Sequence, residues 1–234
     1  MKFTGERFLF GGSSNRTKID SLVKYIFASF FTRNKRILDI ACGSGFGSFM
    51  LAQEASQVTG VDISAESINY AQGCFVAPNL KYRVGDAVSV QLPLKYFDCI
   101  VSFQTIEHLD SPGDFLDNLS QVLKDDGLIV LATPNKKIVS PFTTEPIGKF
   151  HKFEFYKRDL DKMFTHKFNA KWFGQRSTFK PFANYFVRRG LRVFEIMFNK
   201  KFGFYGARES YEIVPLTFWR EPKDFIILLT KKNK

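Results

Sequence analysis

The chain of 234 residues has few cysteines, few histidines and no long apolar run. Its three cysteines, Cys42, Cys74 and Cys99, are far apart and lack the paired spacing of zinc ligands. This excludes a disulfide framework and indicates reduced core thiols of an intracellular protein. No stretch reaches the roughly 18 apolar residues of a membrane span. The first 25 residues carry no signal-peptide pattern, so a cytoplasmic protein is expected.

Positive charge is in excess only in the last hundred residues. Residues 1–134 carry 12 Lys/Arg against 14 Asp/Glu, whereas residues 135–234 carry 22 against 9, so the net charge of +11 comes from the second segment. Such a surface favours anionic partners, among them phospholipid headgroups, nucleic acid and sugar phosphates. The apolar content of 44%, with 28 phenylalanines, is that of a folded chain with one sizeable core.

Strand-like and helix-like segments alternate from residue 36 to residue 134. This pattern is typical of βαβ units in a parallel, doubly wound sheet. The predicted strands are 36–41, 57–62, 80–86, 97–103 and 128–134, and the predicted helices between them are 45–55, 64–75 and 111–127. Two more strands are predicted at 170–175 and 224–232. Ser64 is expected to cap the helix at 64–75, with Ser67 as an alternative start. An amphipathic helix is predicted before the alternation from the spacing of Ile19, Leu22, Val23, Ile26, Phe27 and Phe30.

The stretch RILDIACGSGFG, residues 36–47, places the carboxylate of Asp39 just before Gly43, Gly45 and Gly47. A dinucleotide site needs G-x-G-x-x-G, with backbone amides facing a pyrophosphate. Here the pattern is G-x-G-x-G, followed by Ser48, and the nearby carboxylate disfavours a phosphate. S-adenosylmethionine carries an ammonium and a sulfonium but no phosphate. We therefore expect Asp39 to orient the loop and the ammonium, and the glycines to let the backbone approach the methionine portion.

Two further carboxylates end the next two predicted strands. Asp62, in GVDIS, is placed to accept hydrogen bonds from both ribose hydroxyls, and Asp86, in VGDA, to accept from the adenine amino group. The alternative for each one is a helix cap, a common use of aspartate after a strand. Carboxylates at three consecutive strand ends favour a ligand site.

With these motifs, residues 36–135 resemble the class I S-adenosylmethionine-dependent methyltransferases. The resemblance is carried by ILDIACGSGFGS, GVDIS, VGDA, FDCIVSFQTIEHL and LKDDGLIVLATPN. It implies an α/β fold with a doubly wound, seven-stranded, mostly parallel sheet whose last strand, 224–232, is antiparallel. It also implies S-adenosyl-L-methionine as the cofactor. The cofactor contacts that it implies are Asp39, Ala41, Gly43, Gly45, Asp62, Ile63, Asp86, Ala87, Phe103 and Gln104.

Ala41 departs from the glycine that many members have there, and alanine is a tolerated variant. Arg7, in TGER, is a candidate for the cofactor carboxylate, with a surface arginine as the alternative. TGERF, FHKFEF at 150–155 and FGQRS at 173–177 look like a subgroup associated with bacterial surface-polysaccharide and other glycan pathways.

We expect one methyltransferase domain over residues 1–234. It comprises an arm and helix (1–35), a cofactor-binding half (36–135) and a substrate-side half (136–234) with a basic, aromatic helical insertion at about 179–215. The insertion is open to three interpretations. It is a lid over the acceptor, a membrane-surface element through residues 179–201, or a packed helix at a homodimer contact.

A sugar hydroxyl needs a general base, and histidine is suited because its pKa of about 6.5 lies near the working pH. His151 with Glu154 is the favoured pair, because a spacing of three places both on one face if that stretch is helical. His108 with Glu107 is the alternative base or a structural pair, and His166 is expected at the surface. No His/Asp/Glu group has the spacing of metal ligands, so no metal is expected.

These observations predict O-methylation of a sugar or of a glycan-linked acceptor. One version of this hypothesis has the acceptor presented on a lipid carrier at the inner face of the membrane. The alternatives are a methyltransferase acting on RNA, one acting on a quinone or lipid, and a binding-only protein with the same fold. No nucleic-acid partner is expected, because SFQTIEHL is not the Asn/Asp-Pro-Pro-aromatic motif used on base amino groups.

Overall fold

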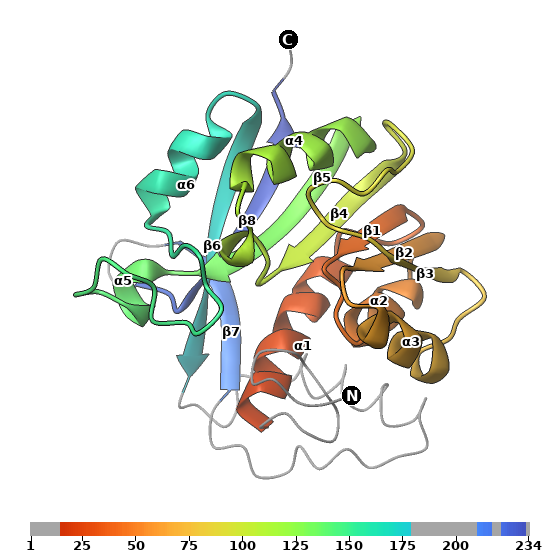
Figure 1. Cartoon of the computed structure of the whole chain (residues 1–234), viewed down its shortest axis with the longest axis horizontal. Coiled ribbons are helices and arrows are strands. Elements are labelled where there is room, and N and C mark those ends of the chain that lie inside the picture. The colour runs from red at the N-terminus through yellow and green to blue at the C-terminus, as the bar shows by residue number, and fades with distance from the viewer. Residues whose placement is uncertain (1–14, 179–209, 217–220, 233–234) are drawn as a thin grey trace.

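The computed structural model describes residues 15–178, 210–216 and 221–232, which form one open sheet with helices on both faces (Figure 1). The strands are β1 Arg36–Ile40, β2 Gln57–Asp62, β3 Leu80–Val84, β4 Phe97–Phe103, β5 Leu123–Pro134, β6 Phe168–Thr178, β7 Ser210–Pro215 and β8 Asp224–Lys231. The helices are α1 Asn15–Ser29, α2 Phe46–Ala52, α3 Ala65–Cys74, the 3-10 helix η1 Ile106–His108, α4 Pro112–Val122, α5 Lys136–Val139 and α6 Lys157–Phe164.

The strand order is β3-β2-β1-β4-β5-β8-β6-β7. Neighbouring strands from β3 to β5 pair parallel, and β8 pairs antiparallel with both β5 and β6. The order reverses between β1 and β4, and ligands of open α/β sheets bind beyond the carboxyl ends of the strands at such a point. The predicted fold class is confirmed, including the antiparallel last strand.

The described part of the chain has eight strands instead of the predicted seven. The additional strand, β7, pairs with β6 at the edge of the sheet. It was predicted as the end of the insertion at 179–215, and that assignment is wrong for residues 210–215. Residues 179–209 lie outside the described residues, so the three interpretations of the insertion stay untested.

Alternate residues of each central strand belong to different faces of the sheet. In β5, Ile129 and Leu131 pack in the cluster that contains α4 and α6, whereas Val130 and Ala132 pack with α1 and α2. All four are at most 1% exposed. Burial on both faces explains why these strands are continuous apolar runs in the sequence.

Three sequence-based predictions are corrected. Helix α4 ends at Val122 instead of just before Gly127, because Leu123 is extended, fully buried and paired with Phe97 at the start of β5. Phe30 follows the end of α1 and is 68% exposed, so it is not on the buried face of that helix. Cys74 is exposed, while the other two cysteines are buried as predicted.

Ser64 caps α3 as predicted, since its side-chain oxygen accepts from the backbone N–H of Ser67 at 3.2 Å. No helix among the described residues is both long and apolar enough to cross a bilayer.

Candidate functional site

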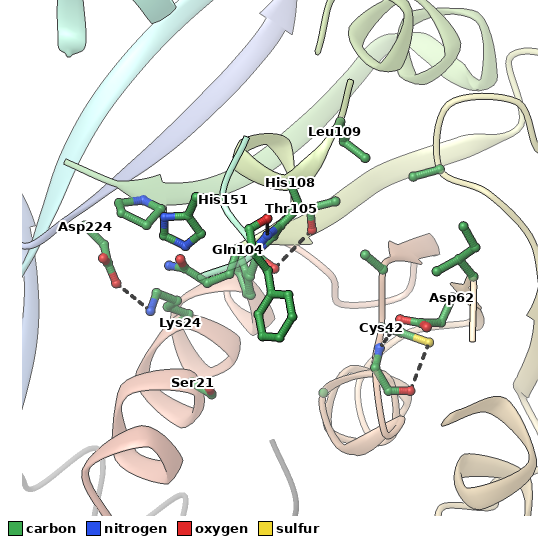
Figure 2. A pocket seen from close by; sticks show the side chains of 18 of the residues that line it. Ser21, Lys24, Cys42, Asp62, Gln104, Thr105, His108, Leu109, His151 and Asp224 are labelled. Carbon is green, nitrogen blue, oxygen red and sulfur yellow. Dashed lines mark hydrogen bonds and ion pairs between the residues drawn. The ribbon is translucent and has the colours of Figure 1, made fainter. Parts of the chain in front are cut away.

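A cavity of about 950 Å³ lies beyond the carboxyl ends of the parallel strands. One end is lined by the β1–α2 turn and by residues that follow β2, β3 and β4. The other end is lined by α1, by residues around η1, by residues 150–152 and by the start of β8. Figure 2 shows Asp62 and Cys42 on one side, and His108, His151, Lys24 and Asp224 on the other.

The three glycines of the β1–α2 turn serve different purposes. Gly43 lines the cavity with a φ of 57°, and a Cβ atom placed on it would meet no atom within 4 Å. A Cβ on Gly45 would lie 2.5 Å from the Cβ of Ala71, and one on Gly47 would lie 1.8 Å from the ring of Tyr25. Gly43 and Gly47 both line the cavity and Gly45 does not, while packing excludes a Cβ atom at Gly45 and at Gly47.

Asp39 lies beneath the turn and does not line the cavity. It is 1% exposed, and its carboxyl accepts hydrogen bonds from the hydroxyls of Ser48 at 2.6 Å and Tyr25 at 3.3 Å. Burial raises the pKa of Asp39 to about 7, although these two hydrogen bonds lower it. Asp39 holds the turn as predicted, by tying β1 to α2 and α1, and its contact with the ammonium stays a prediction.

Asp62 and Asp86 both line the cavity, and each is also used by the backbone. The oxygens of Asp62 accept from the N–H groups of Gly43 at 2.8 Å and Ser64 at 2.9 Å. Oδ1 of Asp86 accepts from the N–H of Val88 at 2.8 Å. A carboxylate has about four lone-pair sites, so both caps are compatible with the predicted contacts to ribose and adenine.

The charge at this end of the cavity fits a cationic, phosphate-free nucleoside. Eight of the predicted cofactor contacts line it, namely Ala41, Gly43, Asp62, Ile63, Asp86, Ala87, Phe103 and Gln104. They include two carboxylates and neither lysine nor arginine, so a phosphate here would face negative charge. Gly45, like Asp39, is absent from the lining. Arg7 lies outside the described residues.

Two lining residues adopt backbone conformations that are unusual for a side chain. Ala41 has a φ of 62° and Gln104 a φ of 52°, and each directly follows a strand of the parallel sheet. Non-glycine residues in this region carry a conformational cost and cluster at functional sites. Both positions were predicted as cofactor contacts.

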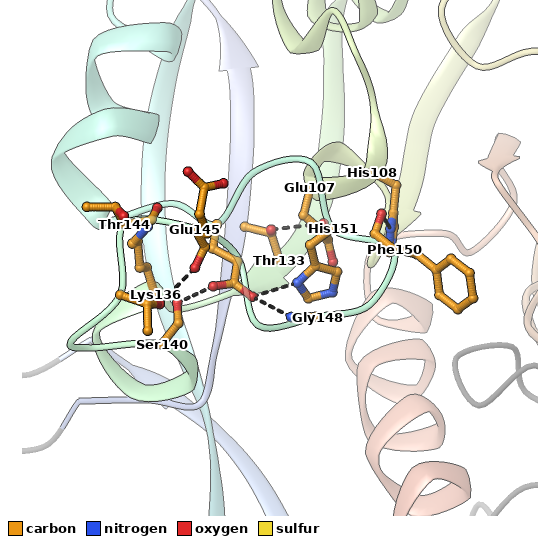
Figure 3. Close-up of polar contacts among 12 residues, drawn as sticks. Glu107, His108, Thr133, Lys136, Ser140, Thr144, Glu145, Gly148, Phe150 and His151 are labelled. Carbon is orange, nitrogen blue, oxygen red and sulfur yellow. Dashed lines mark hydrogen bonds and ion pairs between the residues drawn. The ribbon is translucent and has the colours of Figure 1, made fainter.

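The two histidines that were predicted as catalytic lie together at the other end of the cavity. The ring centroids of His108 and His151 are 5.0 Å apart. Nδ1 of His108 lies 3.0 Å from the carbonyl oxygen of Phe150, and because a carbonyl only accepts, Nδ1 is the donor. Nδ1 of His151 lies 2.8 Å from a carboxylate oxygen of Glu154 (Figure 3).

The pairing of His151 with Glu154 is confirmed, but residues 150–155 are not helical. Glu154 is 7% exposed and also accepts from the hydroxyl of Ser140 and the N–H of Gly148. Burial raises the pKa of Glu154, but the hydrogen bonds from Ser140, His151 and Gly148 outweigh this effect and lower it. The carboxylate therefore orients the imidazole, with Nδ1 donating, and does not itself line the cavity.

Glu107 is fully buried behind the two histidines. One carboxyl oxygen accepts from the hydroxyl of Thr133 at 2.9 Å, and burial raises the pKa of this group to about 8. The Glu107 carbonyl accepts from the N–H groups of Lys152 at 2.8 Å and Phe153 at 3.0 Å. These backbone bonds bring His151 beside η1.

Sequence reasoning missed a buried charge cluster in the same cavity. The ammonium of Lys24 lies 2.6 Å from Asp20 and 2.7 Å from Asp224, and all three residues line the cavity. Burial lowers the pKa of Lys24, but the charges of Asp224 and Asp20 outweigh it and raise the pKa. The only signal in the sequence is the i,i+4 spacing of Asp20 and Lys24, which is common for surface pairs.

Comparisons with known proteins agree with this geometry. Residues 38–131 match the model of a methyltransferase domain. A probable S-adenosylmethionine-dependent methyltransferase of Mycolicibacterium smegmatis is 29% identical over 127 residues, which are 54% of this chain and 49% of that protein. The mitochondrial ubiquinone biosynthesis O-methyltransferase of Schizosaccharomyces pombe is 30% identical over 135 residues, 56% of this chain and 49% of that protein. The chain thus spans about half the length of these curated relatives.

Solved structures share the fold over most of the chain. A possible histamine N-methyltransferase from Thermotoga maritima has a TM-score of 0.65 at 16% identity, covering 92% of this chain and 91% of that one. An S-adenosylmethionine-dependent methyltransferase from Archaeoglobus fulgidus has a TM-score of 0.60 at 22% identity, covering 94% and 95%. Together these findings lead to one conclusion: residues 38–131 match a methyltransferase domain, the chain has the fold of S-adenosylmethionine-dependent methyltransferases, and S-adenosylmethionine is the cofactor of this domain.

Proposed function

We propose that this protein methylates a hydroxyl group of a sugar or of a glycan-linked small molecule. The observation that carries the proposal is the polar lining of the cavity beyond the cofactor end, where His108, His151, Lys24 and Asp224 face the same space. Such groups can hydrogen-bond the hydroxyls of an acceptor. The basic second segment of the chain agrees with an acceptor that carries phosphate on a lipid.

In this proposal the protein holds and aligns the two reactants. When bound, S-adenosylmethionine supplies an electrophilic methyl group. Asp62 accepts from the ribose, Asp86 from the adenine, and the backbone of Gly43 lies along the methionine portion. The cavity lining and the lone pairs that remain on the two carboxylates support these proposed roles.

His151 is the proposed general base. Because Glu154 accepts from Nδ1, the lone pair of the neutral ring lies on Nε2, and the residue lines the cavity. Glu154 acts through His151 as a positioning residue. His108 lies next to it with Nδ1 bound to a carbonyl, so its lone pair is also on Nε2, and it is the alternative base.

Methylation of a quinone is the second candidate, because relatives in Schizosaccharomyces pombe and Coxiella burnetii are named ubiquinone biosynthesis O-methyltransferases. Their similarity covers 56% and 49% of this chain. The polar lining of the acceptor end favours the sugar acceptor over the quinone.

The acceptor can be identified by incubating the purified protein with isotope-labelled S-adenosylmethionine and separate glycan, lipid and RNA extracts. We expect the label in the glycan or glycolipid fraction by mass spectrometry. If the label is found only in quinones of the lipid extract or only in RNA, the proposed function is wrong and the corresponding alternative holds.

Replacing His151 by alanine is expected to lower kcat about 100-fold, the lower end for general base catalysis, because His108 lies beside it. The affinity for S-adenosylhomocysteine should not change, since His151 belongs to the acceptor end. Initial rates and calorimetry measure the two quantities. The matched control is His166→Ala, an exposed histidine outside the cavity lining. Wild-type turnover in His151→Ala would remove this residue from the mechanism.

A further inference from the structure

Glu107, His108 and His151 lie close together, although they come from two separate segments. The two histidines line the acceptor end of the cavity, and Glu107 is buried behind them. Each offers one potential metal-ligand atom, and the three atoms lie within 4.8 Å of one another. The sequence indicated no metal site because the spacing along the chain is not that of a motif. The group forms only when the N–H groups of Lys152 and Phe153 bind the carbonyl of Glu107.

Both imidazoles are held in the way that metal-ligating histidines are held. A ligating histidine almost always donates its other ring N–H to a carboxylate or a backbone carbonyl. His151 donates Nδ1–H to Glu154, and His108 donates Nδ1–H to the carbonyl of Phe150. Glu154 is fixed in turn by the hydroxyl of Ser140 (Figure 3). In both rings Nε2 is then the nitrogen that can bind an ion.

The carboxylate of Glu107 supplies the second, independent observation. The residue is fully buried, and its Oε1 has no hydrogen-bond partner among the residues that the structure describes. The other oxygen accepts from Thr133 at 2.9 Å, which fixes the plane of the carboxyl group. A buried polar atom without a partner costs free energy, and a cation between this group and the histidines would remove that cost.

We propose that Glu107, His108 and His151 bind one divalent transition-metal ion of the Zn²⁺ type. Two imidazoles and one carboxylate are a ligand set that suits such ions and leaves a coordination position for an acceptor oxygen or water. Bond lengths of about 2.1 Å place tetrahedral ligands about 3.4 Å apart. The three ligand atoms, which lie within 4.8 Å of one another, would move closer together when they bind the ion.

The proposed metal site rests on the proposed function only where we predict how the bound ion changes the rate of methyl transfer. The lone pair on Nε2 of His151 cannot bind an ion and accept a proton at the same time. Saturating Zn²⁺ is therefore expected to inhibit methyl transfer in competition with the acceptor and not with S-adenosylmethionine. If the ion instead stimulates turnover, the metal site is supported, and the role of His151 as base is overturned.

Direct binding tests the site without any activity. The full chain, without an affinity tag and with Cys74→Ser to remove the exposed thiol, is titrated with Co²⁺ and followed by visible absorption. We expect d–d bands that saturate at one ion per chain and that Zn²⁺ abolishes by displacement. Calorimetry with Zn²⁺ should give the same stoichiometry.

Variants assign the ion to these ligands. His151→Ala and Glu107→Gln should each weaken Co²⁺ binding at least about 100-fold, and Glu154→Gln about 10- to 100-fold through the orientation of His151. His166→Ala, at an exposed position, should bind like the parent. If Glu107→Gln does not fold, the Co²⁺ affinity of His151→Ala alone tests the site. Absence of saturable binding, or equal binding by His151→Ala and the parent, would overturn the proposal.

Discussion

Lys24→Met is expected to lower the free energy of unfolding by about 3–5 kcal/mol, the range for breaking a buried ion pair. Lys24 is 1% exposed and lies between Asp20 and Asp224. Removing the ammonium leaves Asp224 without this cation and leaves Asp20 with the ammonium of Lys223 at 3.4 Å, in a site where neither carboxylate is well solvated. The cost is large because α1 and β8 are held together by this lysine. Urea unfolding followed by circular dichroism measures the change.

A control variant and a rescue variant distinguish the loss of the buried ion pair from the loss of a lysine side chain in general. Lys95 pairs with Asp125 at 2.7 Å, but both side chains are more than 60% exposed, so Lys95→Met should cost at most about 1 kcal/mol. Adding Asp20→Asn and Asp224→Asn to Lys24→Met should restore part of the lost stability, because the uncompensated charges are then gone. A loss below about 1 kcal/mol in Lys24→Met would show that the cluster is not buried as described.

Asp39→Asn is expected to stabilise the protein above neutral pH. Burial raises the pKa of this carboxyl from 3.8 to about 7 in the folded state. The folded state therefore binds its proton more tightly than the unfolded state, and stability is lost as the pH rises from about 4 to about 7. The full difference corresponds to about 4 kcal/mol at pH 8. Asparagine is neutral throughout, so the variant should not lose this contribution.

The measurement is the difference in unfolding free energy between Asp39→Asn and wild type at several pH values. The difference should be small at pH 4 and should grow in favour of the variant up to about pH 7. Asp126→Asn, at an exposed position, controls for the loss of one negative charge. A difference that stays constant between pH 4 and pH 8 would mean that Asp39 ionises normally in the folded protein.

The cofactor-binding half, residues 36–135, could be predicted from the sequence because short sequence patterns determine its strands and helix starts. Strands buried on both faces are apolar runs, and β4 occupies the predicted residues Phe97–Phe103. Ser64 caps α3 in the predicted way. The end of α4 could not be found, because the burial of Leu123 depends on its pairing with Phe97 in another segment.

The substrate side depends on contacts between distant segments and was only partly predictable. The pairing of His151 with Glu154 was found from a helical spacing, yet a turn anchored by Gly148 produces it. The approach of His151 to Glu107 depends on backbone hydrogen bonds that no side-chain pattern encodes. Lys24 is a polar residue in an amphipathic helix, and only the position of β8 shows that it is buried.

The charge of the cofactor end of the cavity decides which ligand binds there: the predicted contacts that line it include Asp62 and Asp86 and neither lysine nor arginine. Titration calorimetry with S-adenosylhomocysteine and with NAD tests this directly. We expect saturable heat from S-adenosylhomocysteine, an affinity reduced at least about tenfold by Asp62→Ala, and no binding of NAD. Tight binding of NAD together with no heat from S-adenosylhomocysteine would contradict the account.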